Sequence, residues 1–132
     1  MIAKTFSATV LGIDAHLIEV EVDVTVGMSV FNIVGLPDGT IKESRDRVLS
    51  AVNNSGFSFP VRRVVVNLAP APLRKIGSGF DLPIALALLG TMGLFPPENL
   101  SRAMVGELSL DGEIQPVRGI LPVAVATKDH EL

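Results

Sequence analysis

The sequence predicts an α+β domain in which helices cover a mixed β-sheet. Residues 18–26 alternate Ile or Val with Glu, Asp or Thr, which is the period of a strand with one buried and one exposed face. Residues 40–54 and 82–94 instead carry helical patterns, the first amphipathic and the second apolar nearly all round. The elements in chain order are three strands, a helix, a strand, a helix, a hairpin and a final helix, and this order is typical of the α+β class.

Strands are expected on both sides of the first helix. Residues 6–13 and 28–34 flank the clearest strand, so the N-terminal third is predicted to form an antiparallel meander. Residues 61–68 are β-branched on both faces, which predicts a central strand covered on both sides. Asp111-Gly112 predicts a two-residue hairpin turn between residues 104–110 and 113–117.

The first helix has clear start and stop signals. Thr40 followed by Glu43 forms a capping box, and Ser55-Gly56 ends the helix. Because helical spacing places its apolar residues on one side, we expect this helix to bury a single stripe. The stripe consists of Ile41, Val48, Ala51 and Val52.

The charges on this helix leave one cation without a partner. Residues at four-residue spacing pair as Lys42 with Asp46 and Glu43 with Arg47. Arg45 has no such counter-charge on the helix. It is therefore the better candidate for contact with another molecule.

The second helix begins at an aspartate that invites a catalytic interpretation. Asp81 is interpreted here as an N-cap, whose carboxylate accepts backbone N–H bonds and faces the positive end of the helix, a contribution of about 1 kcal/mol. Pro83 fits the first turn, where its missing N–H costs nothing. A final apolar helix is predicted from about Ile120 to Lys128.

Composition excludes several classes of site. The chain of 132 residues is the size of one domain, and a 48% hydrophobic content supports a core. It has no cysteine and only two histidines, His16 and His130, far apart in sequence, so we expect no disulfide, no metal site and no bound cofactor. The N-terminus lacks a signal peptide and the longest apolar tract is too short to span a bilayer, which predicts a cytoplasmic protein with no membrane contact.

The charge is unevenly distributed along the chain. The net charge is -3, yet the segment from Lys42 to Lys75 holds seven basic and two acidic residues. Such a segment forms a nucleic-acid surface if the cations converge in the fold, and a solvated basic face explains it equally well. The candidate nucleic-acid-binding residues are Arg45, Arg62, Arg63, Arg74 and Lys75.

None of the candidate catalytic motifs has the residue spacing that its chemistry requires. The glycine-rich segment at residues 35–44 places its lysine and serine at the wrong spacing for a nucleoside-triphosphate loop. Gly77-Ser78-Gly79 lacks the third glycine of a dinucleotide fingerprint. A serine nucleophile elbow around Ser78 would need glycines where Ile76 and Phe80 stand. We therefore assign no catalytic residue.

The segment "FNIVGLPDGTIKESRDRVLSAVNNSGFSFPVRRVVVNLAPAPLRKIGSGFDLPIALALL" resembles the N-terminal domain of the Mg-chelatase-like AAA+ ATPases of the ComM/YifB family. The resemblance extends over essentially all 132 residues. It implies a ribosomal-protein-S5-domain-2-like fold, shared with the proteolytic domain of Lon. It also implies a bacterial protein in which residues 1–132 precede an ATPase module that binds ATP and Mg²⁺. Family members are linked to natural transformation and resemble ring-forming branch-migration helicases, so the expected partners are the ATPase module, other subunits of a hexameric ring and DNA.

The resemblance to Lon bears on catalysis. The stretch "GELSLDGEIQPVRG", residues 106–119, matches the segment before Lon's catalytic lysine. In that register Asp81 occupies the position of Lon's serine and Leu121 that of its lysine. A carboxylate and an aliphatic chain cannot run a serine–lysine mechanism, because hydroxyl and amine are both missing. We expect a non-catalytic accessory domain; the alternatives are a diverged Lon-like peptidase or a phosphate-binding relative of the GHMP kinases, which share the fold type.

Overall fold

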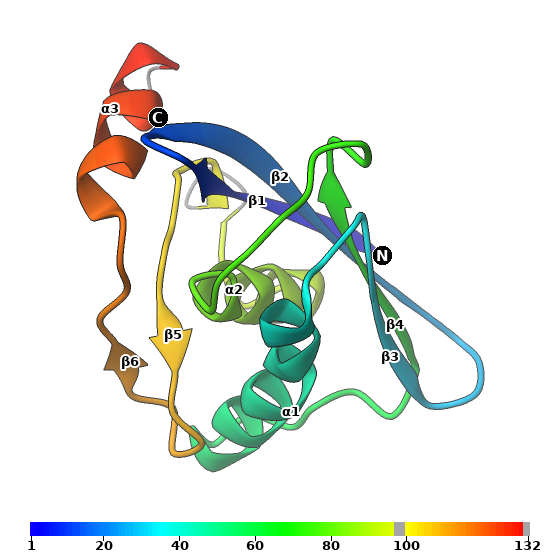
Figure 1. Ribbon diagram of the computed structural model, residues 1–132. Coiled ribbons are helices and arrows are strands. Elements are labelled where there is room, and N and C mark those ends of the chain that lie inside the picture. The colour runs from blue at the N-terminus through cyan, green and yellow to red at the C-terminus, as the bar shows by residue number, and fades with distance from the viewer. Residues whose placement is uncertain (97–99, 131–132) are drawn as a thin grey trace.

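The computed structural model describes residues 1–96 and 100–130 of the chain. It has the predicted α+β architecture, with a mixed four-stranded sheet in the order β1-β2-β4-β3 (Figure 1). The relation to the S5 and Lon folds stays a prediction. The sheet strands are β1 (Ile2–Leu11), β2 (Asp14–Thr25), β3 (Val30–Val34) and β4 (Arg63–Ala69).

The core lies on one face of this sheet. The alternation in β2 buries Ile18, Val20 and Val22 with no exposed surface, as the sequence pattern predicts. The antiparallel register places Val22 opposite Val66 on β4, so the two strands present one continuous apolar surface. The fully buried side chains of β4 on this face are Val64, Val66 and Leu68.

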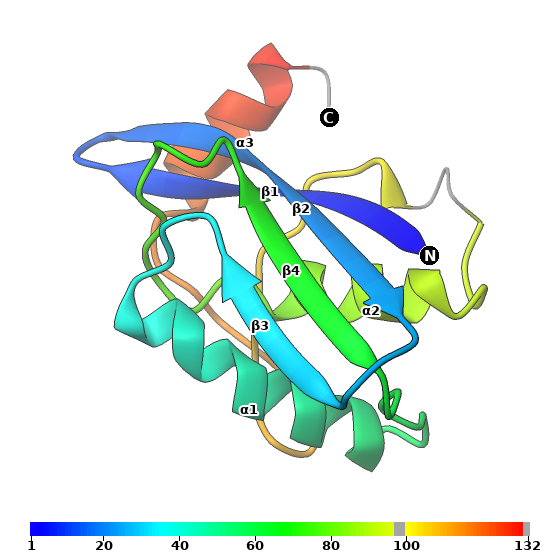
Figure 2. The ribbon, with the colours of Figure 1, turned by 90° about the vertical axis from the view of Figure 1, so that its right-hand side faces the viewer.

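The predicted meander is wrong at its third strand. β1 and β2 form an antiparallel hairpin, but β3 pairs in parallel with β4 instead of returning beside β2. The physical reason is that β4 offers β2 and β3 a strand that is apolar on its core face, and β4 lies between them. Figure 2 looks at β3 and β4 with the chain crossing from one to the other through α1.

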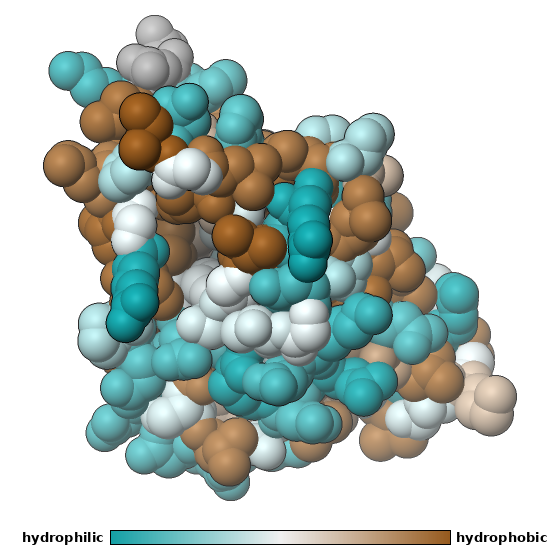
Figure 3. Space-filling model, in the orientation of Figure 1, coloured by the Kyte–Doolittle hydropathy of each residue, from teal (hydrophilic) through white to brown (hydrophobic). Residues whose placement is uncertain are grey.

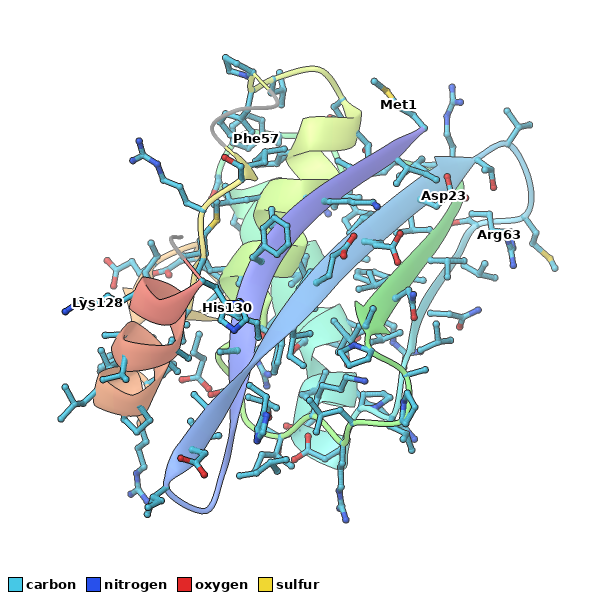
Figure 4. The ribbon with its side chains drawn as sticks, turned by 90° about the horizontal axis from the view of Figure 1, so that it is seen from above. Met1, Asp23, Phe57, Arg63, Lys128 and His130 are labelled. Atoms are coloured by element: carbon cyan, nitrogen blue, oxygen red, sulfur yellow. The ribbon has the colours of Figure 1, made fainter. Side chains whose placement is uncertain are left out.

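The prediction that β4 is covered on both faces is also wrong. Its burial alternates along the strand, with Val65 and Asn67 only half-buried and Arg63 exposed. That second face is open over β4 and β3 (Figure 4). The β-branched run in β4 therefore reflects strand propensity as well as burial.

Two helices cover the core face and a third lies on the other side. α1 (Gly39–Asn54) and α2 (Asp81–Thr91) pack under the sheet, whereas α3 (Ile120–Asp129) lies across the opposite face at the β1–β2 end (Figure 1). The predicted stripe on α1 is confirmed and has one further member, the buried Ser44. α2 is buried nearly all round, as its composition predicts.

The capping box at the start of α1 is a wrong prediction. The N-cap is Asp38, whose carboxylate accepts a 2.8 Å hydrogen bond from the Ile41 amide. Asp38, two residues before Thr40, takes the cap position because its carboxylate accepts a hydrogen bond from one of the free amides of the first helical turn. The helix therefore starts earlier than predicted.

The hairpin after α2 is present but its loop is longer than predicted. β5 (Glu107–Leu108) pairs antiparallel with β6 (Ile114–Gln115). The Ser109 amide donates to the Glu113 carbonyl at 2.9 Å, so three residues, not two, form the loop. The Ser109 hydroxyl donates to Asp111 at 2.5 Å and, with the Glu113 amide, lowers the pKa of that carboxyl.

Candidate functional site

Asp81, the residue on which the catalytic question depends, is fully buried between α1 and α2. Its carboxylate accepts a 2.6 Å bond from Arg47 Nε and a second, at 3.1 Å, from a terminal nitrogen of the same guanidinium. The Ser44 hydroxyl and the Leu108 amide, at 3.0 Å, complete its shell. The hydrogen bonds that Arg47 donates to Asp81 raise the pKa of the Arg47 guanidinium. We call the group Asp81, Arg47 and Ser44 the buried ion-pair cluster.

The cluster joins three elements through one carboxylate. Ser44 and Arg47 lie one turn apart on α1, and the Leu108 amide belongs to β5. The N-cap role that the sequence suggested for Asp81 is therefore wrong. The N-cap position of α2 is Phe80. The Asp81 carboxylate does not cap its own helix, because it accepts hydrogen bonds from α1 and β5 instead.

Sequence reasoning missed this cluster because it assigned Arg47 to Glu43. That surface pair exists at 3.5 Å, but Glu43 is largely exposed and the contact is secondary to the one with Asp81. The predicted pair of Lys42 and Asp46 forms no ion pair in residues 1–96 and 100–130. A signal was present: Ser44 is a polar residue in the apolar stripe of α1, and buried polar groups need partners.

A cleft of about 520 Å³ opens beside the start of α2. Figure 3 shows this face hollowed beneath apolar surface. The loop before α2 and the segment before α3 form its two sides, so the two stretches that carry the Lon resemblance meet here. Its lining residues are Ala8, Val10, Thr40, Ile76, Gly77, Ser78, Gly79, Phe80, Val105, Pro116, Val117, Arg118, Gly119 and Val123.

The residues proposed for the dyad positions lie outside this cleft. Asp81 is in the core, and Leu121 is 76% exposed on α3, where it lines a separate hollow of about 390 Å³. Ser78 is the one serine among the cleft residues. Among those residues the only charged side chain is Arg118, and a guanidinium stays protonated and cannot act as a base. The lining residues therefore carry the hydroxyls of Ser78 and Thr40 but no base to activate either of them.

The start of α2 is not arranged to hold a phosphate. Helix N-termini bind anions through free amides, but here the Asp81 amide donates to Ser78 and the Leu82 amide to Gly106. The next residue, Pro83, has no amide hydrogen. With the first amides used and a carboxylate in the first turn, a GHMP-type phosphate site does not fit this helix.

The structure excludes Lys75 from a nucleic-acid surface. Its side chain has no exposed area, and its ammonium donates to the Pro70 carbonyl. Burial lowers the pKa of Lys75 because desolvation disfavours the charged amine. Its backbone pairs with the segment after β3, so the loop that holds it is packed and not free to turn outward.

Among the other four basic candidates, Arg62 and Arg63 lie far from Arg74. Arg62 and Arg63 stand at the start of β4, and Arg74 follows its far end, about 20 Å away along a seven-residue strand. Arg63 shares its hollow with Glu21 and Asp23, and Figure 4 shows Asp23 and Arg63 at the same end of the sheet. Those carboxylates oppose a phosphate there.

Arg45 has the more favourable surroundings for an anion. It is exposed on α1 and lines a hollow of about 230 Å³ beside the β3 edge. Lys42 lines the same hollow, and no carboxylate does. Two cations without a lining counter-charge attract an anionic group.

Residues 1–96 and 100–130 lack two further features. No helix there is long and apolar enough to cross a membrane. No group of three or more histidine, cysteine, aspartate or glutamate side chains there could hold a metal ion.

Comparison with known proteins places the chain in a family. The model for subunit ChlI of Mg-chelatase matches residues 20–132. Competence protein ComM of Haemophilus influenzae is 40% identical over 128 residues, which is 96% of this chain and 25% of that protein. The chain belongs to the ComM/YifB family of Mg-chelatase-like proteins. YifB of Escherichia coli is 44% identical over 115 residues, 86% of this chain and 23% of YifB.

The chain thus spans about a quarter of the length of its ComM/YifB relatives. A protein of Mycobacterium tuberculosis gives the same proportion, with 44% identity over 128 residues, 96% of this chain and 25% of that protein. The predicted family is therefore confirmed.

Proposed function

We propose that this chain is a non-catalytic accessory domain of a Mg-chelatase-like AAA+ ATPase and that it acts by binding, in ring assembly or in DNA engagement. The whole protein would add an ATPase module that uses ATP and Mg²⁺ and would assemble as a homo-oligomeric ring. One observation carries the proposal. The carboxylate at the start of α2 is committed to the buried ion-pair cluster, and the neighbouring hydroxyl of Ser78 has no base among the cleft residues.

The DNA arm of the proposal rests on Arg45 and Lys42. Both line a hollow without carboxylates, and Arg45 is exposed. Phosphate contacts are electrostatic and independent of sequence, so two adjacent cations suit a backbone-binding role. The family's link to natural transformation agrees with such a role.

Salt-dependent DNA binding tests this arm. Binding of this 132-residue chain to labelled single- and double-stranded oligonucleotides would be followed by fluorescence anisotropy over a salt series. Each lost phosphate contact reduces the slope of log affinity against log salt by about 1, so Arg45→Ala should weaken binding and flatten the slope. Arg102→Ala, an exposed arginine outside the hollow, is the matched control.

Three outcomes would contradict the DNA arm. Absence of binding, or binding that Arg45→Ala and Arg102→Ala change equally, would remove Arg45 as a DNA contact and leave ring assembly as the proposed task. Affinity that does not fall with salt would exclude phosphate contacts altogether.

A peptidase assay tests the non-catalytic part separately. Incubation of the chain with fluorescein-labelled casein should release no fragments. Cleavage that disappears in Ser78→Ala would overturn the proposal, because it would identify an active nucleophile in the cleft.

A further inference from the structure

The cleft beside α2 contains part of a free strand edge. In a strand, the N–H and C=O of one residue point to one side and those of the next residue to the other. The Phe6 carbonyl accepts the Met104 amide at 2.8 Å, on the side of β1 away from β2. Ala8 and Val10 follow at two-residue steps, so their backbone groups face the same edge, and both residues line the cleft.

The chain itself pairs with the first half of this edge and then leaves it. Ala103 forms a parallel bridge with Phe6. Two residues after Met104, the Gly106 amide donates to Gly79 at 3.0 Å, so the chain has turned toward α2. In residues 1–96 and 100–130, no backbone hydrogen bond joins Ala8 or Val10 to a segment outside the β1–β2 hairpin.

The walls of the cleft suit the side chains of an added strand. The apolar lining residues include Val105, Val117, Phe80 and Val123. A volume of about 520 Å³ is within the range of ligand-binding pockets. An unpaired edge next to apolar walls is the arrangement used in strand addition, where the main chain supplies affinity and the walls select alternate side chains.

The charge at the cleft specifies the ligand further. Arg118 is exposed at the cleft, and none of the cleft residues is acidic. No ion pair involves Arg118 in the described part of the chain. A carboxylate on the ligand would supply the missing counter-charge through a charge-assisted hydrogen bond.

We propose that the cleft binds an extended peptide of a partner protein, which adds a strand to β1 at Ala8 and Val10. The peptide carries apolar side chains at alternate positions, which pack against Val105 and Val117, and an acidic group that pairs with Arg118. This inference concerns a protein ligand and does not depend on the DNA contact at Arg45.

The first experiment selects ligands from a displayed library of random heptapeptides, with the whole 132-residue chain as bait. Selected peptides should alternate apolar residues and carry an acidic one. Ser78→Phe, which fills the cleft, should abolish their binding, whereas Ser58→Phe, on an exposed loop, should not. Arg118→Glu should weaken binding at least about tenfold, and the exposed Arg102→Glu should leave it unchanged. Circular dichroism confirms that each variant is folded.

The second experiment tests the strand geometry with a selected peptide. N-methylation of amides that face β1 should abolish binding, and N-methylation of the amides between them should have little effect, because only alternate amides bond to the edge. The amide resonances of Ala8 and Val10 should shift on titration with the peptide.

Several results would overturn the inference. They are a library without enriched peptides, binding that survives both Ser78→Phe and Arg118→Glu, and N-methylation effects without alternation. A dimer of the unliganded chain that Ser78→Phe alone dissociates would make a second copy the occupant instead of a partner peptide. A chain that binds DNA through Arg45 but no peptide would lose this inference and keep the proposed function.

Discussion

Asp81 and Glu43 both contact the guanidinium of Arg47, but one carboxylate is buried and the other is exposed. Asp81 has no exposed area, and Glu43 is 73% exposed. Asp81→Asn should lower the free energy of unfolding by about 3 kcal/mol, because it leaves Arg47 without its charged partner. Glu43→Gln should cost no more than about 0.5 kcal/mol. Urea denaturation of both variants measures the difference, and equal losses would contradict the assignment of Asp81 as the main partner of Arg47.

Lys75 makes stability depend on pH in the alkaline range. Burial lowers its pKa below the ordinary value of 10.5, so between the folded pKa and 10.5 the unfolded chain binds more protons. The free energy of unfolding should therefore rise with pH through this window and level off above it. Urea titrations from roughly pH 7 to pH 10 should show a smaller rise in Lys75→Met. Lys128→Met, at an exposed lysine, should keep the wild-type rise, and an unchanged rise in Lys75→Met would count against the burial argument.

At the scale of elements, the start of α1 depends on one side chain. Asp38→Ala should destabilise the protein by about 1 kcal/mol, because the Ile41 amide loses its acceptor. Thr40→Ala removes the residue that the sequence pattern marks as the cap, and it should have a smaller effect. Thermal unfolding of the two variants compares the two positions, and a larger loss in Thr40→Ala would restore the capping box.

The turn from β3 toward α1 requires a glycine for two reasons. Gly35 has a φ of 101°, and a Cβ there would lie 2.1 Å from the Leu68 carbonyl oxygen of β4. Gly77 has a φ of 96° with no atom near its missing Cβ. A substitution at Gly77 therefore measures the cost of the backbone conformation without any steric clash. Gly77→Ala should cost about 1–3 kcal/mol, and Gly35→Ala more, because the β4 backbone must also move. Chemical denaturation of the two variants measures both losses of stability. Similar losses would mean that the β4 backbone moves at little cost to accommodate the new Cβ.

At the scale of the whole molecule, α3 covers the β1–β2 end of the second face of the sheet. Val123 is 7% exposed and Val125 is 54% exposed on this helix. Val123→Ala should lower the free energy of unfolding by about 2 kcal/mol, because it removes buried apolar surface, and Val125→Ala should change it little. Equal effects in urea denaturation would indicate that α3 does not pack on β1 and β2.

Local patterns predicted much of the fold. The alternation around Val20 and Val22 predicted β2, and the helical spacing of Ile41 and Val48 predicted the buried face of α1. Both patterns are local, because the geometry of a strand or helix sets which neighbours share a face. Sheet order was not predictable in this way, since the parallel pairing of β3 with β4 joins strands that α1 separates in the chain.

By itself, the sequence determined the class of the fold, the family of the chain and the presence of a carboxylate, in place of a hydroxyl, at position 81. Only the tertiary structure decided what Asp81 does, because its partner Arg47 lies 34 residues away in the chain and contacts Asp81, at 2.6 Å, more closely than Glu43, at 3.5 Å. It also decided that Lys75, a surface cation by composition, is buried. The physical reason is the same in both cases: charge and hydrogen-bonding capacity belong to a residue, but burial and partner belong to the packing of the elements around it.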